Sequence, residues 1–138
     1  MNVLIYRWKA YNYIDVIETL KRLGHTVEEL EYHLDSYDED AVFFELLRGR
    51  LLSGNYAFVF TINYFGVVSV VCECCYVKYV SWTCDNPLIS MYHASVFNSC
   101  NYIFCFDRTN YLEFKGMGCG HIWHLPLAVD TERIGHVL

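Results

Sequence analysis

The stretch AFVFTI, residues 57–62, constrains the fold of this chain more than any other feature. It is almost continuously apolar and lacks the alternation of a strand that has one face in water. Such a run is typical of a strand in a parallel sheet whose two faces are both covered by helices. Residues 77–82 and 102–106 have the same character, so we expect these three strands in the centre of one sheet.

Strand-like and helix-like patterns alternate along the whole chain. Between the strands, apolar residues recur at helical spacing, Asn12 and Gly24 flank the first of these segments, and the acidic residues 38–40 open the second. The segment 65–75 contains four valines, which favour a strand. However, parallel strands at 57–62 and 77–82 need a crossover of about a dozen residues between them, so we expect a buried helix at 65–75. The expected strands are 3–6, 26–34, 57–62, 77–82, 102–106 and 121–125, and the expected helices are 12–23, 38–51, 65–75, 86–96 and 107–116.

This alternation predicts a single α/β domain that spans residues 1–138. The expected architecture is a three-layer sandwich, Rossmann-like or flavodoxin-like, around a mainly parallel six-stranded sheet. The more polar strand at 26–34 belongs at an edge, which favours the strand order 2-1-3-4-5-6. The helix at 38–51 should bury a stripe formed by Val42, Phe43, Leu46, Leu47 and Leu51.

Composition restricts the kinds of partner. The chain is 54% hydrophobic and only 19% charged, so either both sheet faces are covered or part of the surface meets a partner. A homodimer formed through exposed apolar surface is one such arrangement. The formal net charge of −6 argues against nucleic acid, because phosphate contacts need a basic surface.

The cysteines and the amino terminus bear on the compartment. Seven cysteines are an odd number, and residues 1–6 lack the basic and apolar regions of a signal peptide. No run approaches the roughly 18 apolar residues of a membrane span. We therefore expect reduced thiols and a cytoplasmic protein. We expect no metal site, because a helical Cys72-x-x-Cys75 is usually core packing and Cys119, His121 and His124 are weakly constrained.

Polar and aromatic residues follow several of the expected strands. In an open parallel sheet, ligands bind beyond the carboxyl ends of the strands, near the point where the strand order reverses. Asp85 and Asp107 are the candidate catalytic residues at this edge. The candidate substrate-binding residues are Trp8, Asn12, Asn63, Tyr64, Trp82 and Asn86.

Structural explanations compete with these roles. Asn86 and Asp107 are also plausible helix caps, and the large aromatic residues could simply close the core. Alternatively, the same aromatic rings could stack on a sugar or a nucleobase. No G-x-G-x-x-G or P-loop motif is present, so we expect no nucleotide cofactor. Arg7-Trp8 and Asn63 stand where a phosphoacceptor receiver domain needs acids, which excludes that chemistry.

Several segments in order resemble the amino-terminal domain of the bacterial spore-maturation-protein-like glycosyltransferases, which have the two-domain GT-B architecture. The matching segments are LIYRW, LKRLGHTVEELEY, FTINYF, KYVSWTCDNPL, NYIFCFDRTNYLEFKGMG and HLPLAVDTERI. The most specific elements are Trp82-x-x-Asp85-x-Pro87-Leu88 and residues 125–130, LPLAVD. Cys84 departs from the pattern, because an aromatic residue is expected before Asp85.

The resemblance implies an acceptor-binding domain that is inactive alone, with the nucleotide-sugar donor held by a carboxyl-terminal domain that this chain lacks. In an inverting enzyme, Asp85 or else Asp107 would serve as the general base. The aromatic and amide residues would then position the acceptor, for which a carbohydrate is one candidate. The alternative function is a non-enzymatic module with the same fold that binds a small ligand or another protein.

Overall fold

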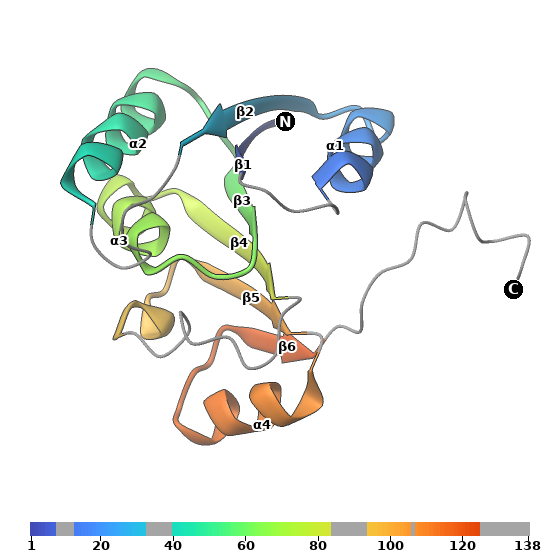
Figure 1. Cartoon of the computed structure of the whole chain (residues 1–138), viewed down its shortest axis with the longest axis vertical. Helices are drawn as coiled ribbons and strands as arrows, with labels where there is room; N and C mark the ends of the chain where they lie inside the picture. The colour runs from blue at the N-terminus through green and yellow to red at the C-terminus, as the bar shows by residue number, and fades with distance from the viewer. Residues whose placement is uncertain (8–12, 33–39, 84–93, 106, 125–138) are drawn as a thin grey trace, which may run out of the picture.

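The computed structural model describes residues 1–7, 13–32, 40–83, 94–105 and 107–124 (Figure 1). Its strands are β1 (Asn2–Arg7), β2 (Thr26–Glu31), β3 (Phe58–Ile62), β4 (Lys78–Thr83), β5 (Asn101–Cys105) and β6 (Ile122–His124). Its helices are α1 (Tyr13–Arg22), α2 (Ala41–Ser53), α3 (Gly66–Cys75), the 3-10 helix η2 (Ala94–Phe97) and α4 (Arg108–Gly116). None of the helices in these ranges has the length and apolar character needed to cross a membrane.

The six strands form one parallel sheet in the order β2-β1-β3-β4-β5-β6. This result confirms the predicted α/β class and the predicted strand order. The polar strand β2 is at one edge, as expected, and β6 is at the other. The segment rich in valine forms helix α3, so the length needed for a parallel crossover was a better guide than β propensity.

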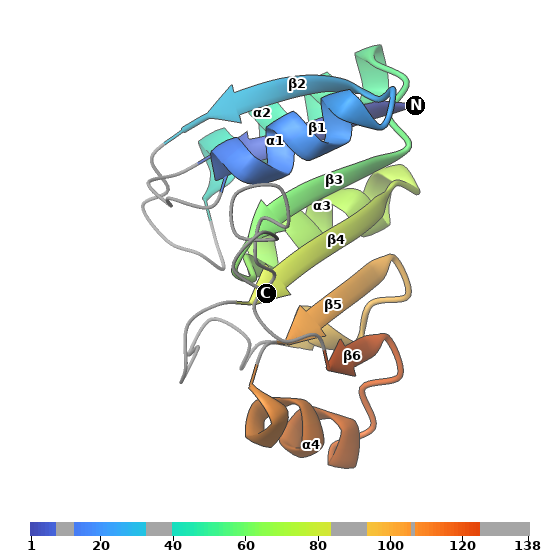
Figure 2. The same cartoon turned by 90° about the vertical axis from the view of Figure 1, so that its right-hand side faces the viewer.

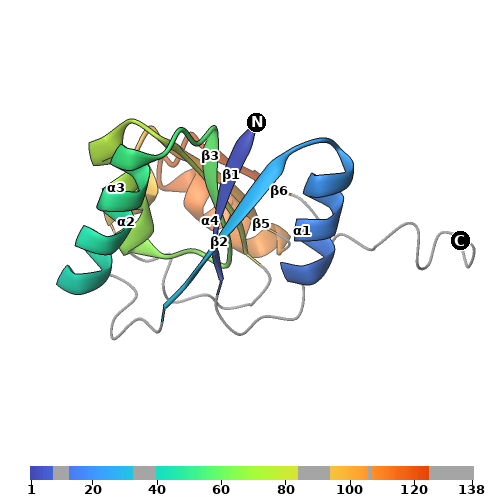
Figure 3. The same ribbon diagram turned by 90° about the horizontal axis from the view of Figure 1, so that it is seen from above.

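The helices are divided unequally between the two faces of the sheet. The chain moves in one direction from β1 to β2 and in the opposite direction at every later crossover. Because parallel crossovers are right-handed, α1 lies on one face and α2 and α3 lie on the other (Figure 3), where η2 and α4 join the same core cluster. Phe43, Val68, Val96 and Phe114 accordingly share one core cluster, whereas Ile17 of α1 belongs to the other.

Helix α2 begins at Ala41, after the last of the three acidic residues expected to open it, and buries a narrower stripe than predicted. The Asp40 side chain accepts a hydrogen bond from the backbone nitrogen of Phe43 at 2.9 Å and so caps the helix. Its buried residues are Phe43, Leu47 and Leu51, spaced by four. The prediction was wrong for Val42 and Leu46, which are exposed, because each precedes a buried position by one residue and so points about 100° away from it.

The predicted helix from Pro87 falls partly outside the described residues. Residues 94–97 form the 3-10 helix η2 and not the end of an α-helix. The backbone nitrogen of Asn98 donates to the carbonyl of Ser95 at 2.9 Å, which is the three-residue spacing of a 3-10 turn. Val96 is buried, as predicted, but it reaches the core from this tighter turn.

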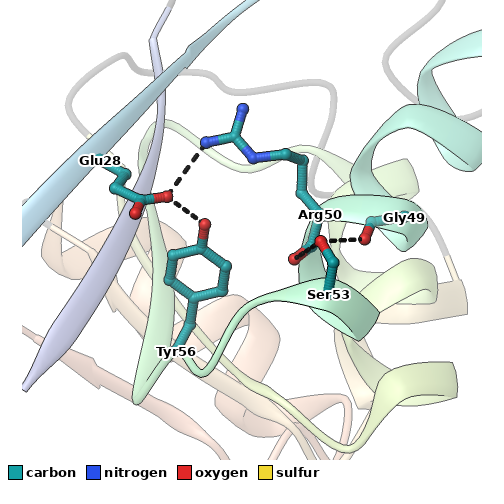
Figure 4. Close-up of polar contacts among 5 residues, drawn as sticks. All are labelled: Glu28, Gly49, Arg50, Ser53 and Tyr56. Carbon is teal, nitrogen blue, oxygen red and sulfur yellow. Dashed lines mark hydrogen bonds and ion pairs between the residues drawn. The ribbon is translucent and has the colours of Figure 1, made fainter.

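A polar cluster ties the edge strand β2 to the connection that precedes β3 (Figure 4). Glu28 accepts hydrogen bonds from the Tyr56 hydroxyl and, at 3.2 Å, from the Arg50 guanidinium. The bond from Tyr56, followed by that from Arg50, lowers the pKa of the Glu28 carboxyl. Near the end of α2, the Ser53 hydroxyl donates to the carbonyl of Gly49 at 2.8 Å. The cluster joins β2, α2 and the segment before β3 at the end of β3 that lies opposite the predicted site.

Candidate functional site

The carboxyl ends of all six strands point toward one edge of the sheet, because the strands are parallel (Figure 2). The direction of the crossovers reverses between β1 and β3, so this pair marks the place where ligands bind in open α/β sheets. Of the predicted site residues, Asn63, Tyr64, Trp82 and Asp107 are described at or near this edge. The other four, Trp8, Asn12, Asp85 and Asn86, lie outside the described residues.

Two predicted residues from neighbouring strands are brought into direct contact. The backbone nitrogen of Asn63 donates to the carbonyl of Trp82 at 2.7 Å, which extends the β3–β4 pairing by one bond. Asn63 has φ = 67°, in the left-handed region that asparagine tolerates better than most residues. Its side chain is buried, so this residue turns the chain out of β3 and into α3.

A buried chain of hydroxyl groups fixes the connection between β3 and α3. The Thr61 hydroxyl donates to the carbonyl of Asn63 at 2.6 Å, and the Tyr79 hydroxyl lies 2.6 Å from Thr61 Oγ1. The backbone nitrogen of Phe65 donates to the Tyr79 hydroxyl at 3.1 Å. Burial raises the pKa of Tyr79 well above its ordinary value. The loop is therefore held by a neutral phenol on the adjacent strand.

Tyr64 lies in the core and not at an open edge. Its ring is fully buried, and its hydroxyl lies 2.5 Å from Ser95 Oγ in η2. Burial raises the pKa of Tyr64 to about 12. The Asn101 amide donates to the Ser95 carbonyl at 2.7 Å, and the Ser69 hydroxyl donates to Asn101 Oδ1 at 2.6 Å. This network anchors η2 to α3 and β5, and the predicted contact of Tyr64 with a substrate has no support from its position.

Trp82 is also largely enclosed. Its side chain is 7% exposed and packs in the core cluster on the α1 side of the sheet, with Ile5, Ile17 and Ile62. Its neighbour Thr83 points to the other face, and the Thr83 hydroxyl donates to the carbonyl of Phe104 at 3.2 Å. Tyr64 and Trp82 therefore pack in the core, as the structural explanation expected, and their rings are not placed to stack on a ligand.

Asp107 is the one candidate catalytic residue in the described part of the chain. Its carboxylate accepts a hydrogen bond from the backbone nitrogen of Asn110 at 3.1 Å and caps α4, as the sequence allowed. The residue is partly exposed, and Arg108 beside it is exposed. A capping carboxylate has a second oxygen that can face a ligand, so the cap does not exclude a catalytic role.

Sequence reasoning missed several buried polar residues in the strands and helices. They are Thr61, Ser69, Tyr79, Ser81, Ser95 and Asn101. Each is a hydroxyl or amide residue inside an otherwise apolar strand or helix. Such a group is rarely buried without a hydrogen bond, so its position in the sequence could have indicated a buried hydrogen-bond network. Ser81 pairs in register with Thr61, and its buried hydroxyl has no hydrogen-bond partner among the described residues.

Two of the described cysteines are held as neutral thiols by burial. Burial raises the pKa of Cys72 well above its ordinary value and that of Cys100 to about 12. Both thiols are therefore protonated near neutral pH, a state that disfavours nucleophilic attack and metal ligation. Within the described ranges, no three His, Cys, Asp or Glu side chains come close enough to share a metal ion.

The chain matched no family model, no curated protein and no solved structure in the three comparisons made.

Proposed function

We propose that this chain is the acceptor-binding domain of a GT-B glycosyltransferase. In this proposal, a second domain holds a nucleotide-sugar donor, and the carboxyl edge of the sheet forms one wall of the cleft between them. The observation that carries the proposal is the parallel sheet in the order β2-β1-β3-β4-β5-β6, with its reversal between β1 and β3. Such an edge is the usual ligand site of this class of fold.

The rigidity of one connection further supports a ligand site at this edge. Asn63 adopts φ = 67°, and the Tyr79–Thr61 chain of hydrogen bonds fixes the segment that follows it. A residue held in a sparsely populated conformation by several long-range contacts is more common at functional sites than elsewhere. The connection between β3 and α3 is thus rigid before any ligand arrives, which reduces the entropy lost on binding.

The candidate carboxylates have a defined role in an inverting transfer, whereas a retaining transfer would need no such base. A carboxylate accepts the proton of the acceptor hydroxyl while that oxygen forms a bond to the anomeric carbon of the donor sugar. The bond from this carbon to the nucleoside diphosphate breaks, and the diphosphate leaves with the bonding electron pair. Asp85 is the first candidate for the base and lies outside the described residues. Asp107, at the start of α4, is the second candidate.

The second candidate function is a binding or interaction module without catalysis. The burial of Asn63, Tyr64 and Trp82 favours it, because all three described candidates for acceptor binding are used within the fold. This alternative needs no donor domain and no base. The two functions can be distinguished because replacing the catalytic carboxylate abolishes sugar transfer only if the protein is an enzyme.

The test uses the protein that carries both domains, together with UDP-, GDP- and dTDP-sugars as probes. The readout is release of the nucleoside diphosphate. Asp85→Asn and Asp107→Asn are compared with Asp40→Asn, since Asp40 is also a helix cap and sits on the same side of the sheet as Asp107. At Asp107 and Asp40, asparagine retains the capping oxygen, and at each of the three positions it removes the carboxylate with little change in size, so folding should survive.

Loss of a general base costs on the order of 10²–10⁴ in rate. We expect a loss of this size in Asp85→Asn, or else in Asp107→Asn, and none in Asp40→Asn. Unchanged turnover in both Asp85→Asn and Asp107→Asn would remove these carboxylates from the mechanism. Absence of nucleoside diphosphate release from every probe, by a folded wild-type protein, would favour the binding module.

A further inference from the structure

The first turn of α3 has backbone donors without hydrogen-bond acceptors. Helix α3 follows β3, so it begins at the carboxyl edge of the sheet. Its first helical hydrogen bond runs from the Ser69 nitrogen to the carbonyl of Phe65 at 3.2 Å, and no side-chain hydrogen bond caps the helix at Phe65. The amide groups of Gly66, Val67 and Val68 therefore have no acceptor among the described residues.

These amide groups are enclosed by the protein and do not face bulk water. Gly66 is buried, and the exposed fractions of Val67 and Val68 are 2% and 0%. At a helix end that faces solvent, water satisfies the first amide groups. A buried helix end needs another acceptor, because a buried donor without a partner carries the full cost of its desolvation.

A buried hydroxyl group on the neighbouring strand is a second, independent exception. Ser81 of β4 is fully buried, and its Oγ atom has no hydrogen-bond partner within the described ranges. The large majority of buried side-chain polar atoms in proteins are hydrogen-bonded, so an exception requires an explanation. An acceptor from outside these ranges would satisfy both the Ser81 hydroxyl and the amide groups of α3.

The Ser81 side chain points toward the start of α3. Ser81 alternates with Tyr79 along β4, so both side chains lie on the face that α3 covers. The Tyr79 hydroxyl lies 2.6 Å from that of Thr61, which is the register partner of Ser81. The Tyr79 ring therefore extends along β4 to the level of Ser81, where its hydroxyl accepts from the Phe65 nitrogen at 3.1 Å. The Ser81 hydroxyl thus lies beside the backbone that leads into α3.

Donors of this kind are complementary to an oxyanion. The oxygens of a phosphate or carboxylate accept hydrogen bonds, and the dipole of α3 places roughly half a positive charge at this end of the helix. The connection from β3 to α3 lacks the glycine-rich loop that encloses a diphosphate. Three amide groups and one hydroxyl therefore match a single anionic group and not the diphosphate of a nucleotide.

We propose that the start of α3 binds one phosphate group through the amide groups of Gly66, Val67 and Val68 and the hydroxyl of Ser81. The site follows β3, one of the two strands between which the crossovers reverse. It does not depend on sugar transfer, because a binding module with this edge would hold the same group. Combined with the proposed function, it assigns a phosphate group to the acceptor.

The first measurement is the urea midpoint of the full chain in phosphate, with sodium chloride at equal ionic strength as the reference. A ligand that binds only the folded state raises the midpoint once its concentration exceeds the dissociation constant. None of the four donors is a charged side chain, so we expect a dissociation constant of about 1 mM. The midpoint should then rise by roughly 1 M urea at about 20 mM phosphate. Glucose 6-phosphate is the second probe, and a tighter response to it than to inorganic phosphate would identify the group as part of an acceptor.

Ser81→Ala removes one of the four donors and should weaken phosphate binding about 10–100-fold, since hydrogen bonds to charged groups are strong. Without phosphate, its urea midpoint should equal or exceed that of the wild type, because the lost hydroxyl has no partner in the described part of the chain. The matched control is Ser95→Ala. Ser95 in η2 is also buried, but its hydroxyl lies 2.5 Å from that of Tyr64. This control should lower the midpoint without phosphate and retain the full response to phosphate.

The second measurement locates the bound anion by proton–nitrogen correlation NMR. The amide signals of Gly66, Val67 and Val68 should shift as phosphate is added, with the same half-saturation as the rise in urea midpoint. The amide of Phe43 in the first turn of α2 is the control. It already donates to the Asp40 carboxylate at 2.9 Å, so its signal should stay in place.

Three results would overturn the proposal. The first is the same urea midpoint in phosphate and in chloride. The second is a phosphate response that Ser81→Ala leaves unchanged, since the hydroxyl would then bond to a buried water. The third is a set of shifted amide signals away from the start of α3. These measurements use no sugar donor, so their failure is separate from a failure to release nucleoside diphosphate.

Discussion

The hydroxyl of Tyr79 on β4 lies 2.6 Å from the hydroxyl of Thr61 on β3, and both groups are buried. Thr61 donates to the carbonyl of Asn63, so Tyr79 must be the donor between the two hydroxyls. Tyr79 in turn accepts from the backbone nitrogen of Phe65. A single directional chain of hydrogen bonds thus runs from the start of α3 through β4 and back to the end of β3.

We predict that Tyr79→Phe destabilises the fold. The change removes a donor to Thr61 and an acceptor for the Phe65 nitrogen, and it leaves both groups buried. The free energy of unfolding in urea should fall by about 1–3 kcal/mol. Tyr102→Phe, on the neighbouring strand at a partly exposed position, should change it by less than about 0.5 kcal/mol. Equal effects of the two changes would contradict the assigned hydrogen bonds.

Thr61→Val tests whether the chain of hydrogen bonds acts as a unit. Thr61 and Tyr79 share one hydrogen bond, so the effects of Thr61→Val and Tyr79→Phe should not add. In a double-mutant cycle measured by urea unfolding, we expect a coupling of about 0.5–3 kcal/mol. A coupling near zero would mean that the two hydroxyls stabilise the fold independently.

Ser69→Ala should weaken the network that holds η2. Ser69 donates to Asn101 Oδ1 at 2.6 Å and accepts from the Asn98 amide at 3.1 Å, inside the core. Loss of this hydroxyl leaves the buried Asn101 oxygen with only the weak donor of the Cys100 thiol, at 3.5 Å, and should cost about 1–3 kcal/mol. Ser53→Ala is the matched control in another helix, because the Ser53 hydroxyl bonds at an exposed site. It should be nearly neutral by the same denaturation measurement.

Tyr76→Gly should stabilise the protein. Tyr76 ends α3 in the left-handed region with φ = 56°, and its side chain is 97% exposed, so almost no burial is lost. Glycine is favoured at this position of a helix end, and we expect a gain of about 0.5–1 kcal/mol in unfolding free energy. Tyr76→Ala retains a Cβ atom and should not stabilise. If Tyr76→Ala raised the unfolding free energy as much as Tyr76→Gly, the stabilisation would come from removal of the ring and not from the backbone conformation.

Glu73 should make stability depend on pH in the acid range. Hydrogen bonds from the Cys100 backbone nitrogen, the Cys100 thiol and the Ser99 hydroxyl lower the pKa of this carboxyl below its ordinary value of 4.5. A lowered pKa in the folded state adds stability above pH 4.5, and that stability disappears as the pH falls through the folded-state pKa.

Comparison with Glu73→Gln isolates this contribution. The wild-type protein should have the higher urea midpoint at pH 7, and the difference should narrow below pH 4.5. Ser99→Ala removes one of the donors and should show a smaller effect in the same direction. If the difference in urea midpoint widened as the pH fell, the pKa of Glu73 would be raised in the folded state and not lowered.

The fold could be predicted because its determinants are local. The apolar run at β3 requires cover on both faces, and the length of the α3 segment requires a crossover between parallel strands. The caps at Asp40 and Asp107 follow from side chains close to the helix starts that they satisfy. The strand order follows from the polar character of β2 and the handedness of crossovers.

The candidate site could be predicted only as an edge of the sheet. Polar and aromatic residues after a strand can point toward a ligand or into the core, and their identity is the same in both cases. Tyr64 turns inward because Ser95, 31 residues away, meets its hydroxyl in η2. Trp82 turns inward because α1 covers it. Neither partner is identifiable from the residues next to them in the sequence.

The amino-acid sequence by itself determined the class of the sheet, the order of its strands and the edge to which the candidate site residues were assigned, because hydrophobic periodicity and chain length act over short distances. Only the tertiary structure decided which side chains at that edge are buried and which donors near the start of α3 have no acceptor among the described residues. Both depend on contacts between residues far apart in the chain. Thr61 and Tyr79, on neighbouring strands and 18 positions apart, are one such pair.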